Sequence, residues 1–183
     1  MIITITGMPG SGKSTVGRLL AEQLGYKFYS VGDFRGEMAQ KLGLTIDELN
    51  KIGEKEFWTD QKADVWQKKI GQTENNVVID GWLAFHFVPK SFKIFIDVEL
   101  KFAAHRIFID QRPDEKYLSS ETAIEKQIDE RLEKTRKRFL KYYQVDFLNK
   151  DYYDLIIDST NILPQEVVNK IIKHYERIKN NGS

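Results

Sequence analysis

The sequence predicts a doubly wound α/β domain, in which helices pack on both faces of a parallel sheet. Five short runs are rich in β-branched and aromatic residues and lack polar alternation, as expected of strands that are buried on both faces. Stretches in which apolar residues recur at helical spacing separate these runs. A glycine-rich turn joins the first run to the first helical stretch, an order that is typical of this fold class.

The predicted strands are short apolar segments spread along the whole chain. Each is followed by a helical stretch or a long connection, and strands connected in this way pair in parallel. They cover residues 2–6, 27–31, 76–80, 92–98 and 153–158.

The predicted helices are identified from apolar spacing and from signals at their ends. The first covers residues 14–24, and Gly25 ends it. Thr45 followed by Glu48 has the pattern of a capping box that opens another helix. Further helices are expected at 34–42, 60–70, 119 to about 141, and 164 to about 178 behind an N-terminal proline.

Length, charge and composition bound the class of protein. The chain has 183 residues, 41% of them hydrophobic, which predicts a single domain over residues 1–179 with a frayed tail at 180–183. The net charge of +1 gives no overall reason to expect a nucleic acid or a membrane as partner. The chain has no cysteine, which excludes a disulfide scaffold and a thiolate metal site. We expect a protein of the cytoplasm, without a signal peptide or a membrane helix.

The glycine-rich turn matches the pattern G-x-x-x-x-G-K-[ST] in full. Its glycines allow a tight turn, its backbone N–H groups point inward, and the following helix adds partial positive charge, so the segment predicts a phosphate-binding loop. Lys13 is expected to reach the β and γ phosphates of ATP, and the Ser14 hydroxyl to bind Mg²⁺. The alternative is a merely tight turn between strand and helix. The predicted ATP-binding residues are Gly7, Met8, Pro9, Gly10, Ser11, Gly12, Lys13, Ser14 and Thr15.

Two aspartates stand where predicted strands end. Asp80 closes the apolar run "VVID" and is the candidate for the carboxylate that places the metal ion; the alternative is an aspartate that caps the next turn. Asp33 follows the second run and is either the N-cap of the next helix or a contact to the phosphoryl acceptor. Both interpretations of Asp33 stay open.

A basic cluster lies in the long charged helix. Between residues 131 and 141 it holds six Lys or Arg side chains against one acid, Glu133. Helical geometry places Arg131, Lys134 and Arg138 on one face and turns residues 136 and 137 away from it. Such a face suits the charge that spreads over a phosphoryl group during transfer. A solvated helix face and a nucleic-acid surface are the alternatives.

The order of these segments resembles the small cytidylate kinases of archaea and related bacteria, which belong to the nucleoside monophosphate kinase group. The resemblance runs from about residue 1 to 175 and rests on "GMPGSGKST", "SVGDFRGEMAQKLG", "VVIDG", "RIFIDQR", "IDERLEKTRKRFLKYYQVD" and "YDLIIDST". It implies a three-layer P-loop kinase fold with a five-stranded parallel sheet and a helical lid at about 106–140. It further implies transfer of a phosphoryl group from Mg²⁺-ATP to CMP or dCMP.

The same resemblance assigns roles to several residues. Arg106 and Arg112 fall in the lid that closes on the donor phosphates, and Ser159 to Asn161 would flank the adenine. Arg131 and Arg138 are spaced like the pair that meets the acceptor and the transferred group. The expected catalytic residues are therefore Lys13, Arg112, Arg131 and Arg138.

The sequence departs from the family pattern on the acceptor side. Gly36 and Trp82 stand where the family carries arginines, and Thr135 stands where it carries a carboxylate. Arg35 lies one place before the first of these positions. Trp82 either stacks on a base or packs into the core with its aromatic neighbours Phe85 and Phe87.

These observations predict an ATP- and Mg²⁺-dependent phosphotransferase that acts on a nucleoside monophosphate. The alternatives are a kinase of a nucleoside or another small alcohol, and a nucleotide-dependent switch or RNA-associated ATPase. We expect a monomer that binds small nucleotide substrates and neither a membrane nor nucleic acid. The predicted acceptor-binding residues are Asp33, Arg35, Asp80, Trp82 and Arg131, and the predicted metal ligands are Ser14 and Asp80.

Overall fold

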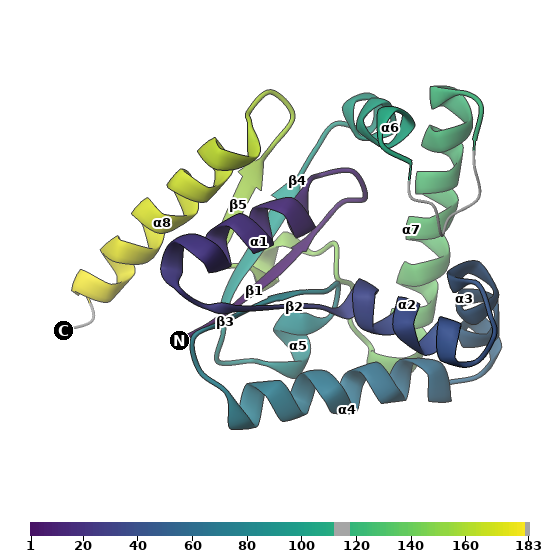
Figure 1. Cartoon of the computed structure of the whole chain (residues 1–183), viewed down its shortest axis with the longest axis horizontal. Helices are drawn as coiled ribbons and strands as arrows, with labels where there is room; N and C mark the ends of the chain where they lie inside the picture. The colour runs from purple at the N-terminus through teal and green to yellow at the C-terminus, as the bar shows by residue number, and fades with distance from the viewer. Residues whose placement is uncertain (112–117, 182–183) are drawn as a thin grey trace.

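The computed structural model describes residues 1–111 and 118–181. Within these residues five strands form one parallel sheet in the order β2-β3-β1-β4-β5, so that β1 is central (Figure 1). The predicted five-stranded parallel sheet is thereby confirmed. The strands are β1 (Ile2–Gly7), β2 (Lys27–Ser30), β3 (Val77–Asp80), β4 (Phe92–Asp97) and β5 (Leu155–Asp158).

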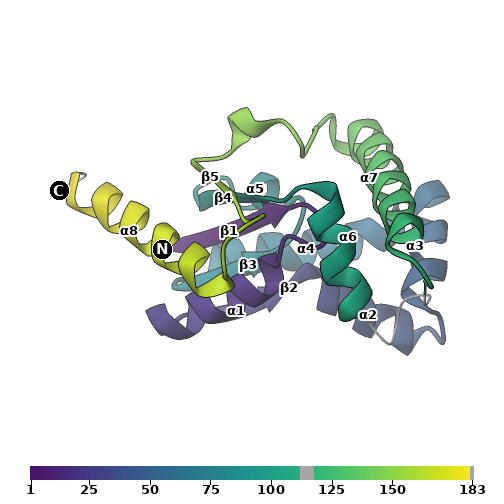
Figure 2. The same ribbon diagram turned by 90° about the horizontal axis from the view of Figure 1, so that it is seen from above.

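Helices surround the sheet on both faces and beyond the carboxyl ends of its strands (Figures 1 and 2). They are α1 (Lys13–Leu24), α2 (Val31–Lys41), α3 (Ile46–Lys55), α4 (Trp58–Thr73), α5 (Ala84–Phe87), α6 (Leu100–Ile109), α7 (Glu121–Tyr143), the short 3₁₀ helix η1 (Lys150–Tyr152) and α8 (Pro164–Asn181).

Two main apolar clusters hold the layers together. On one face α1 and α8 bury side chains such as Leu20 and Ile171 against β1 and β4. On the other face Phe95 of β4 packs with Phe147 and with side chains of α6 and α7. A smaller cluster joins α4 and α5 to β3. Because α2, α3, α6 and α7 stand near the carboxyl ends of the strands (Figure 2), any ligand at that edge would meet several helices.

Local signals fix most of the element boundaries. The predicted capping box is present, with Thr45 accepting from the Glu48 amide and the Glu48 carboxylate accepting from the Thr45 amide. The second strand ends one residue earlier than predicted, because the Ser30 side chain caps α2 by accepting from the Asp33 amide at 3.1 Å. Asp33 as the N-cap is therefore wrong, since it lies inside the first turn of the helix.

Other boundaries also differ from the prediction, among them those of α4, which spans Trp58–Thr73 where 60–70 is predicted. Helix α8 continues to Asn181, past the expected end at about 178, and so includes two residues of the tail expected at 180–183. The predicted lid region, about 106–140, consists of the end of α6 and most of α7 where the structure describes it. No helix in the described part of the chain is both long and apolar enough to cross a membrane.

Candidate active site

The glycine-rich turn forms a tight loop between β1 and α1. Gly10 and Gly12 have φ angles of 72° and 78°, in the left-handed region that favours glycine. A Cβ on Gly10 would lie 2.7 Å from the Ala103 carbonyl oxygen, so α6 packs directly on the loop. Gly12 gives α1 no side-chain cap, which leaves the first amides of the helix available to a ligand. The loop thus has the geometry that binds a phosphate chain.

The predicted metal ligands lie side by side at the start of α1. The Ser14 hydroxyl donates to Asp80 Oδ2 at 2.5 Å, although the two residues are 66 positions apart in the chain. Asp80 is buried, with 3% of its surface exposed. No group of three or more His, Cys, Asp or Glu side chains suited to a metal occurs in the described ranges. The hydroxyl and carboxylate therefore fit an ion that takes its other ligands from phosphates and water, as Mg²⁺ does.

Arg106 ties the end of the sheet to the glycine-rich loop. Its Nη2 donates to the carbonyls of Ser159 at 2.7 Å and Thr160 at 3.1 Å, and its Nη1 donates to the Gly10 carbonyl at 3.4 Å. The Ser159 hydroxyl in turn donates to the Ser11 carbonyl at 3.0 Å. The segment expected to flank adenine is thus bonded to the loop expected to bind the phosphates.

One continuous cavity of about 670 Å³ extends from the glycine-rich loop toward α2, α3, α4 and α7. On the loop side it is lined by Lys13, Ser14, Asp80 and Arg106. The opposite wall is rich in charged and polar side chains from four helices, namely Arg35, Asp47, Asn50, Lys51, Glu54, Asp60, Asp64, Gln67, Arg131, Lys134, Thr135, Arg138 and Tyr143. A volume of this size accommodates a ligand of nucleotide dimensions.

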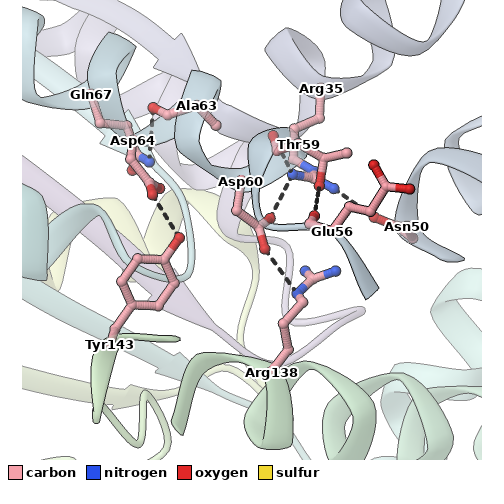
Figure 3. A network of polar contacts seen from close by, with 10 residues as sticks. All are labelled: Arg35, Asn50, Glu56, Thr59, Asp60, Ala63, Asp64, Gln67, Arg138 and Tyr143. Carbon is pink, nitrogen blue, oxygen red and sulfur yellow. Dashed lines mark hydrogen bonds and ion pairs between the residues drawn. The ribbon is translucent and has the colours of Figure 1, made fainter. Parts of the chain in front are cut away.

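An ion-paired cluster forms one part of that wall (Figure 3). Asp60 on α4 accepts from Arg35 Nη1 at 2.7 Å through one oxygen, and its other oxygen lies 3.2 Å from Arg138 Nε. Arg35 also donates to the Thr59 carbonyl at 3.2 Å and to Asn50 Oδ1 at 3.1 Å. The three charged side chains are 6–11% exposed. Burial lowers the pKa of Arg35, and Asp60 opposes that shift. One carboxylate thus neutralises part of two guanidinium charges.

A second polar group on α4 lies one turn further along the same wall. Tyr143 donates its hydroxyl to Asp64 Oδ2 at 2.6 Å (Figure 3). Burial raises the pKa of Asp64 to about 6, and burial together with Asp64 raises the pKa of Tyr143. Gln67 is 2% exposed and donates its amide to the Ala63 carbonyl at 3.2 Å.

Sequence reasoning missed the importance of this face of α4. Asp60, Asp64 and Gln67 follow the same i, i+4, i+7 spacing as a buried helix face. Polar residues at positions that periodicity assigns to the interior are the signal that would have identified them.

Trp82 contacts the glycine-rich loop, the aromatic ring of Phe147 and the helix α7. Its Nε1 donates to the Gly7 carbonyl at 3.0 Å, and its ring stacks on Phe147 with the centroids 5.3 Å apart. The guanidinium of Arg131 lies 5.5 Å from the centre of the same ring. Phe85 and Phe87 are buried, as expected if this segment packs on the core. Trp82 is only partly buried and also lines the cavity.

The basic cluster of α7 divides between the cavity and the surface. Arg131, Lys134 and Arg138 line the cavity, so the predicted shared face is confirmed. Arg136 forms an ion pair with Asp146, and Lys137 pairs with Glu133 one turn earlier on the exposed side. Thr135 is buried and lines the cavity beside these cations.

Three other predicted positions lie differently. Asp33 pairs with Arg18 at 2.7 Å on the surface and is not among the described residues that line the cavity, so the structure separates it from the other acceptor candidates. A Cβ on Gly36 would meet no described atom within 4 Å. Arg112 lies outside the described residues.

Comparison with known proteins gives consistent results. The profile of the cytidylate kinase-like family matches residues 2–161. The chain is 39% identical to a cytidylate kinase of Sulfurisphaera tokodaii, over 96% of this chain and 94% of that protein. It is 35% identical to a cytidylate kinase of Archaeoglobus fulgidus, over 96% of this chain and 95% of that one.

A further relative is longer. An S-adenosylmethionine-dependent nucleotide dehydratase of Lacinutrix mariniflava is 37% identical over 96% of this chain, but the chain spans only 36% of that protein. Among solved structures, a shikimate kinase of Bacteroides thetaiotaomicron aligns with a TM-score of 0.68 at 19% identity, over 96% of this chain and 98% of the other. At that identity the likeness shows the fold alone.

Proposed function

The chain belongs to the cytidylate kinase-like family, and from this premise we propose that it transfers a phosphoryl group from Mg²⁺-ATP to a pyrimidine nucleoside monophosphate, CMP or dCMP. The observation that carries the proposal is the single cavity that joins the phosphate loop to a wall of charged side chains. A donor and an acceptor bound in one cavity are brought into contact without water between them, which is the main requirement of phosphoryl transfer.

The donor half would bind the triphosphate through the loop. Backbone amides at the end of the loop and in the first turn of α1 would surround the phosphates, and Lys13 would donate to the β and γ oxygens. Ser14 and Asp80 would hold Mg²⁺, whose chemistry is to neutralise charge on the phosphate oxygens. Arg106 positions the loop and the segment after β5 relative to each other, because its bonds go to carbonyls of both.

The acceptor half would supply the positive charge that a transferring phosphoryl group needs. Arg131, Lys134 and Arg138 enter the cavity from one face of α7. As the in-line transfer proceeds, these cations stabilise negative charge on the equatorial oxygens, and little covalent chemistry is left for the protein. We also assign Arg112 to this role, and Arg35, Asp80 and Trp82 to the acceptor site. Asp33 would have to leave Arg18 to take part.

Two of the relatives support a nucleotide as the acceptor. Both cytidylate kinases match this chain over nearly their full length. The longer relative is described as acting on a nucleotide, which is consistent with a nucleotide product from its matching region. We further propose a monomer and a cytoplasmic location.

A second candidate acceptor is a nucleoside or another uncharged alcohol. The observation that favours it is the pairing of both Arg35 and Arg138 with Asp60, which leaves less positive charge for an acceptor phosphate. A phosphate dianion would have to compete with that carboxylate.

Coupled ADP-release assays with CMP, dCMP, UMP, AMP and the corresponding nucleosides separate these candidates. Stimulation by CMP or dCMP supports the proposal, and stimulation by cytidine but not by CMP supports the second candidate. Slow ADP release that no acceptor changes would contradict both and favour a nucleotide-dependent switch.

A further inference from the structure

Asp64 and Gln67 form a small polar wall in the acceptor part of the cavity. They lie one turn apart on α4, and both line the cavity. Their exposed fractions are 7% and 2%, so neither is a surface group that water satisfies freely. The side chains of Asp64 and Gln67 form hydrogen bonds with Tyr143 and Ala63, not with the glycine-rich loop of the donor site.

The Gln67 amide has one oxygen that is not used. Its Nε2 donates to the Ala63 carbonyl, and this fixes the orientation of the amide, because the reversed amide would place two oxygens against each other. Oε1 is buried and has no hydrogen-bond partner among the described residues. A buried acceptor without a donor costs free energy in the unliganded protein, and a ligand that supplies the donor recovers it.

Asp64 adds a second acceptor beside it. The hydroxyl of Tyr143 takes Oδ2, and the carboxylate retains its other oxygen, Oδ1. The ion pairs of Asp60 with Arg35 and Arg138 lie one turn earlier on the same helix, so these two cavity-lining cations already have an anionic partner (Figure 3). The wall therefore offers hydrogen-bond acceptors to a ligand.

We propose that Asp64 and Gln67 read the base of the acceptor by accepting hydrogen bonds from its exocyclic amino group. This inference rests on the proposed nucleotide kinase activity and adds the part of the substrate that α4 selects. The amino group of cytosine carries two hydrogens and can satisfy two acceptor oxygens. Uracil has a carbonyl oxygen at that position, which would face the two oxygens without a proton between them. The site thus prefers an aminopyrimidine nucleotide to its oxo counterpart.

The distribution of charge in the cavity agrees with an acceptor whose base lies at α4 and whose phosphate lies near the cations of α7. Arg138 of α7 pairs with Asp60 and Tyr143 of α7 bonds to Asp64, whereas the cations Arg131 and Lys134 lie earlier on α7, away from the acceptor oxygens of Asp64 and Gln67. A nucleoside monophosphate has the same polarity, with an anionic phosphate at one end and an amino group on the base at the other.

The decisive variant is Gln67→Met, which keeps the length of the side chain and removes the unpaired oxygen. Steady-state kcat/KM is measured with CMP and UMP for the whole chain. We expect the wild type to prefer CMP. In the variant the ratio of kcat/KM for CMP to kcat/KM for UMP should fall about tenfold or more, because kcat/KM for CMP falls while that for UMP stays nearly unchanged. Gln61→Met is the matched control, because Gln61 is exposed on the same helix, and its ratio should equal that of the wild type.

Asp64→Asn is the second variant, and circular dichroism checks that each variant is folded. An equal loss with CMP and UMP in both variants would show a structural role and overturn the inference. A wild type that accepts CMP and UMP equally would overturn it without any variant, while leaving the nucleotide kinase proposal intact. A wild type that turns over no nucleoside monophosphate would overturn the proposed function, and this inference with it.

Discussion

The two ends of the cavity are built by different means. At the donor end most of the binding groups come from one contiguous segment, residues 7–15, and Asp80 and Arg106 join it from β3 and α6. The acceptor end is assembled from side chains of α2, α4 and α7, which meet only after folding. The donor end is thus specified largely by a short motif and the fold, whereas each acceptor contact depends on the packing of several helices.

The two ends also handle charge differently. At the loop, part of the positive potential comes from backbone amides and the dipole of α1, which carry no formal charge, and Lys13 adds one formal charge. At the acceptor end, full charges are buried and held in place by one another, as in the cluster of Asp60 with its two arginines. Buried pairs of this kind are sensitive to the loss of one partner. The acceptor end should therefore be the less tolerant of substitution in terms of stability.

The largest effect is expected from Lys13→Ala at the donor end. Loss of this ammonium removes charge stabilisation from the transferred phosphoryl group and should lower kcat/KM for any acceptor by about a thousandfold. Coupled ADP release measures it, with thermal melting to show that the fold is retained. Lys170→Ala, on the exposed side of α8, is the control and should behave as the wild type. Turnover that survives in Lys13→Ala would disprove the assignment of the donor site.

Asp60→Asn tests the acceptor end through stability. It leaves two nearly buried guanidinium groups without their carboxylate, so we expect a loss of about 3–5 kcal/mol in the free energy of unfolding. Asp33→Asn is the matched control, because it breaks a solvent-exposed pair with Arg18 and should cost less than about 1 kcal/mol. Urea unfolding compares the two variants. Equal losses would mean that burial does not distinguish these pairs.

The pH dependence of Asp64→Asn is a smaller and more specific test. The pKa of Asp64 is raised from 3.8 to about 6 by burial, with Asp60 adding to the shift and Tyr143, Lys68 and Arg35 opposing it. A raised pKa in the folded state means that the protonated form is favoured there. The stabilising contribution of the protonated Asp64 carboxyl group is fully present below about pH 4 and is lost as the pH rises through about 6.

The asparagine variant avoids this loss because its side chain does not ionise. A shift of this size corresponds to about 3 kcal/mol, and access of cavity water reduces it to about 2 kcal/mol. The unfolding free energy of the variant, relative to the wild type, should therefore rise by about that amount between pH 4 and pH 8. Unfolding by urea at both pH values measures the difference. A constant difference would show that Asp64 titrates as it does in the unfolded chain.

The smallest effect is expected from Trp82→Phe. Trp82 lies between the donor and acceptor ends of the cavity, because it contacts both Gly7 and Arg131. The change keeps an aromatic ring against Phe147 but removes the bond from Nε1 to the Gly7 carbonyl. A lost neutral hydrogen bond is worth about 1 kcal/mol, so we expect Mg²⁺-ATP to bind about fivefold more weakly. Isothermal titration calorimetry measures this affinity. If only the acceptor affinity changed, Trp82 would belong to the acceptor end alone.

The amino-acid sequence by itself determined the parts of this protein that depend on local order. The five strands were predicted because an apolar run without alternation requires cover on both faces. The phosphate loop was predicted because its glycines, Lys13 and Ser14 are neighbours in the chain. The capping box at Thr45 was equally local.

Only the tertiary structure decided which polar groups meet. Helical periodicity places Asp64 and Gln67 on an inner face of α4 but does not indicate that Tyr143, 79 residues later, bonds to that carboxylate. Likewise Ser30 and Asp33 are both good N-cap residues, and the end of β2 selected Ser30. Spacing along the chain fixes which side of an element is buried, whereas the partner on that side is fixed by the packing of distant elements, and for buried charges the partner decides both stability and chemistry.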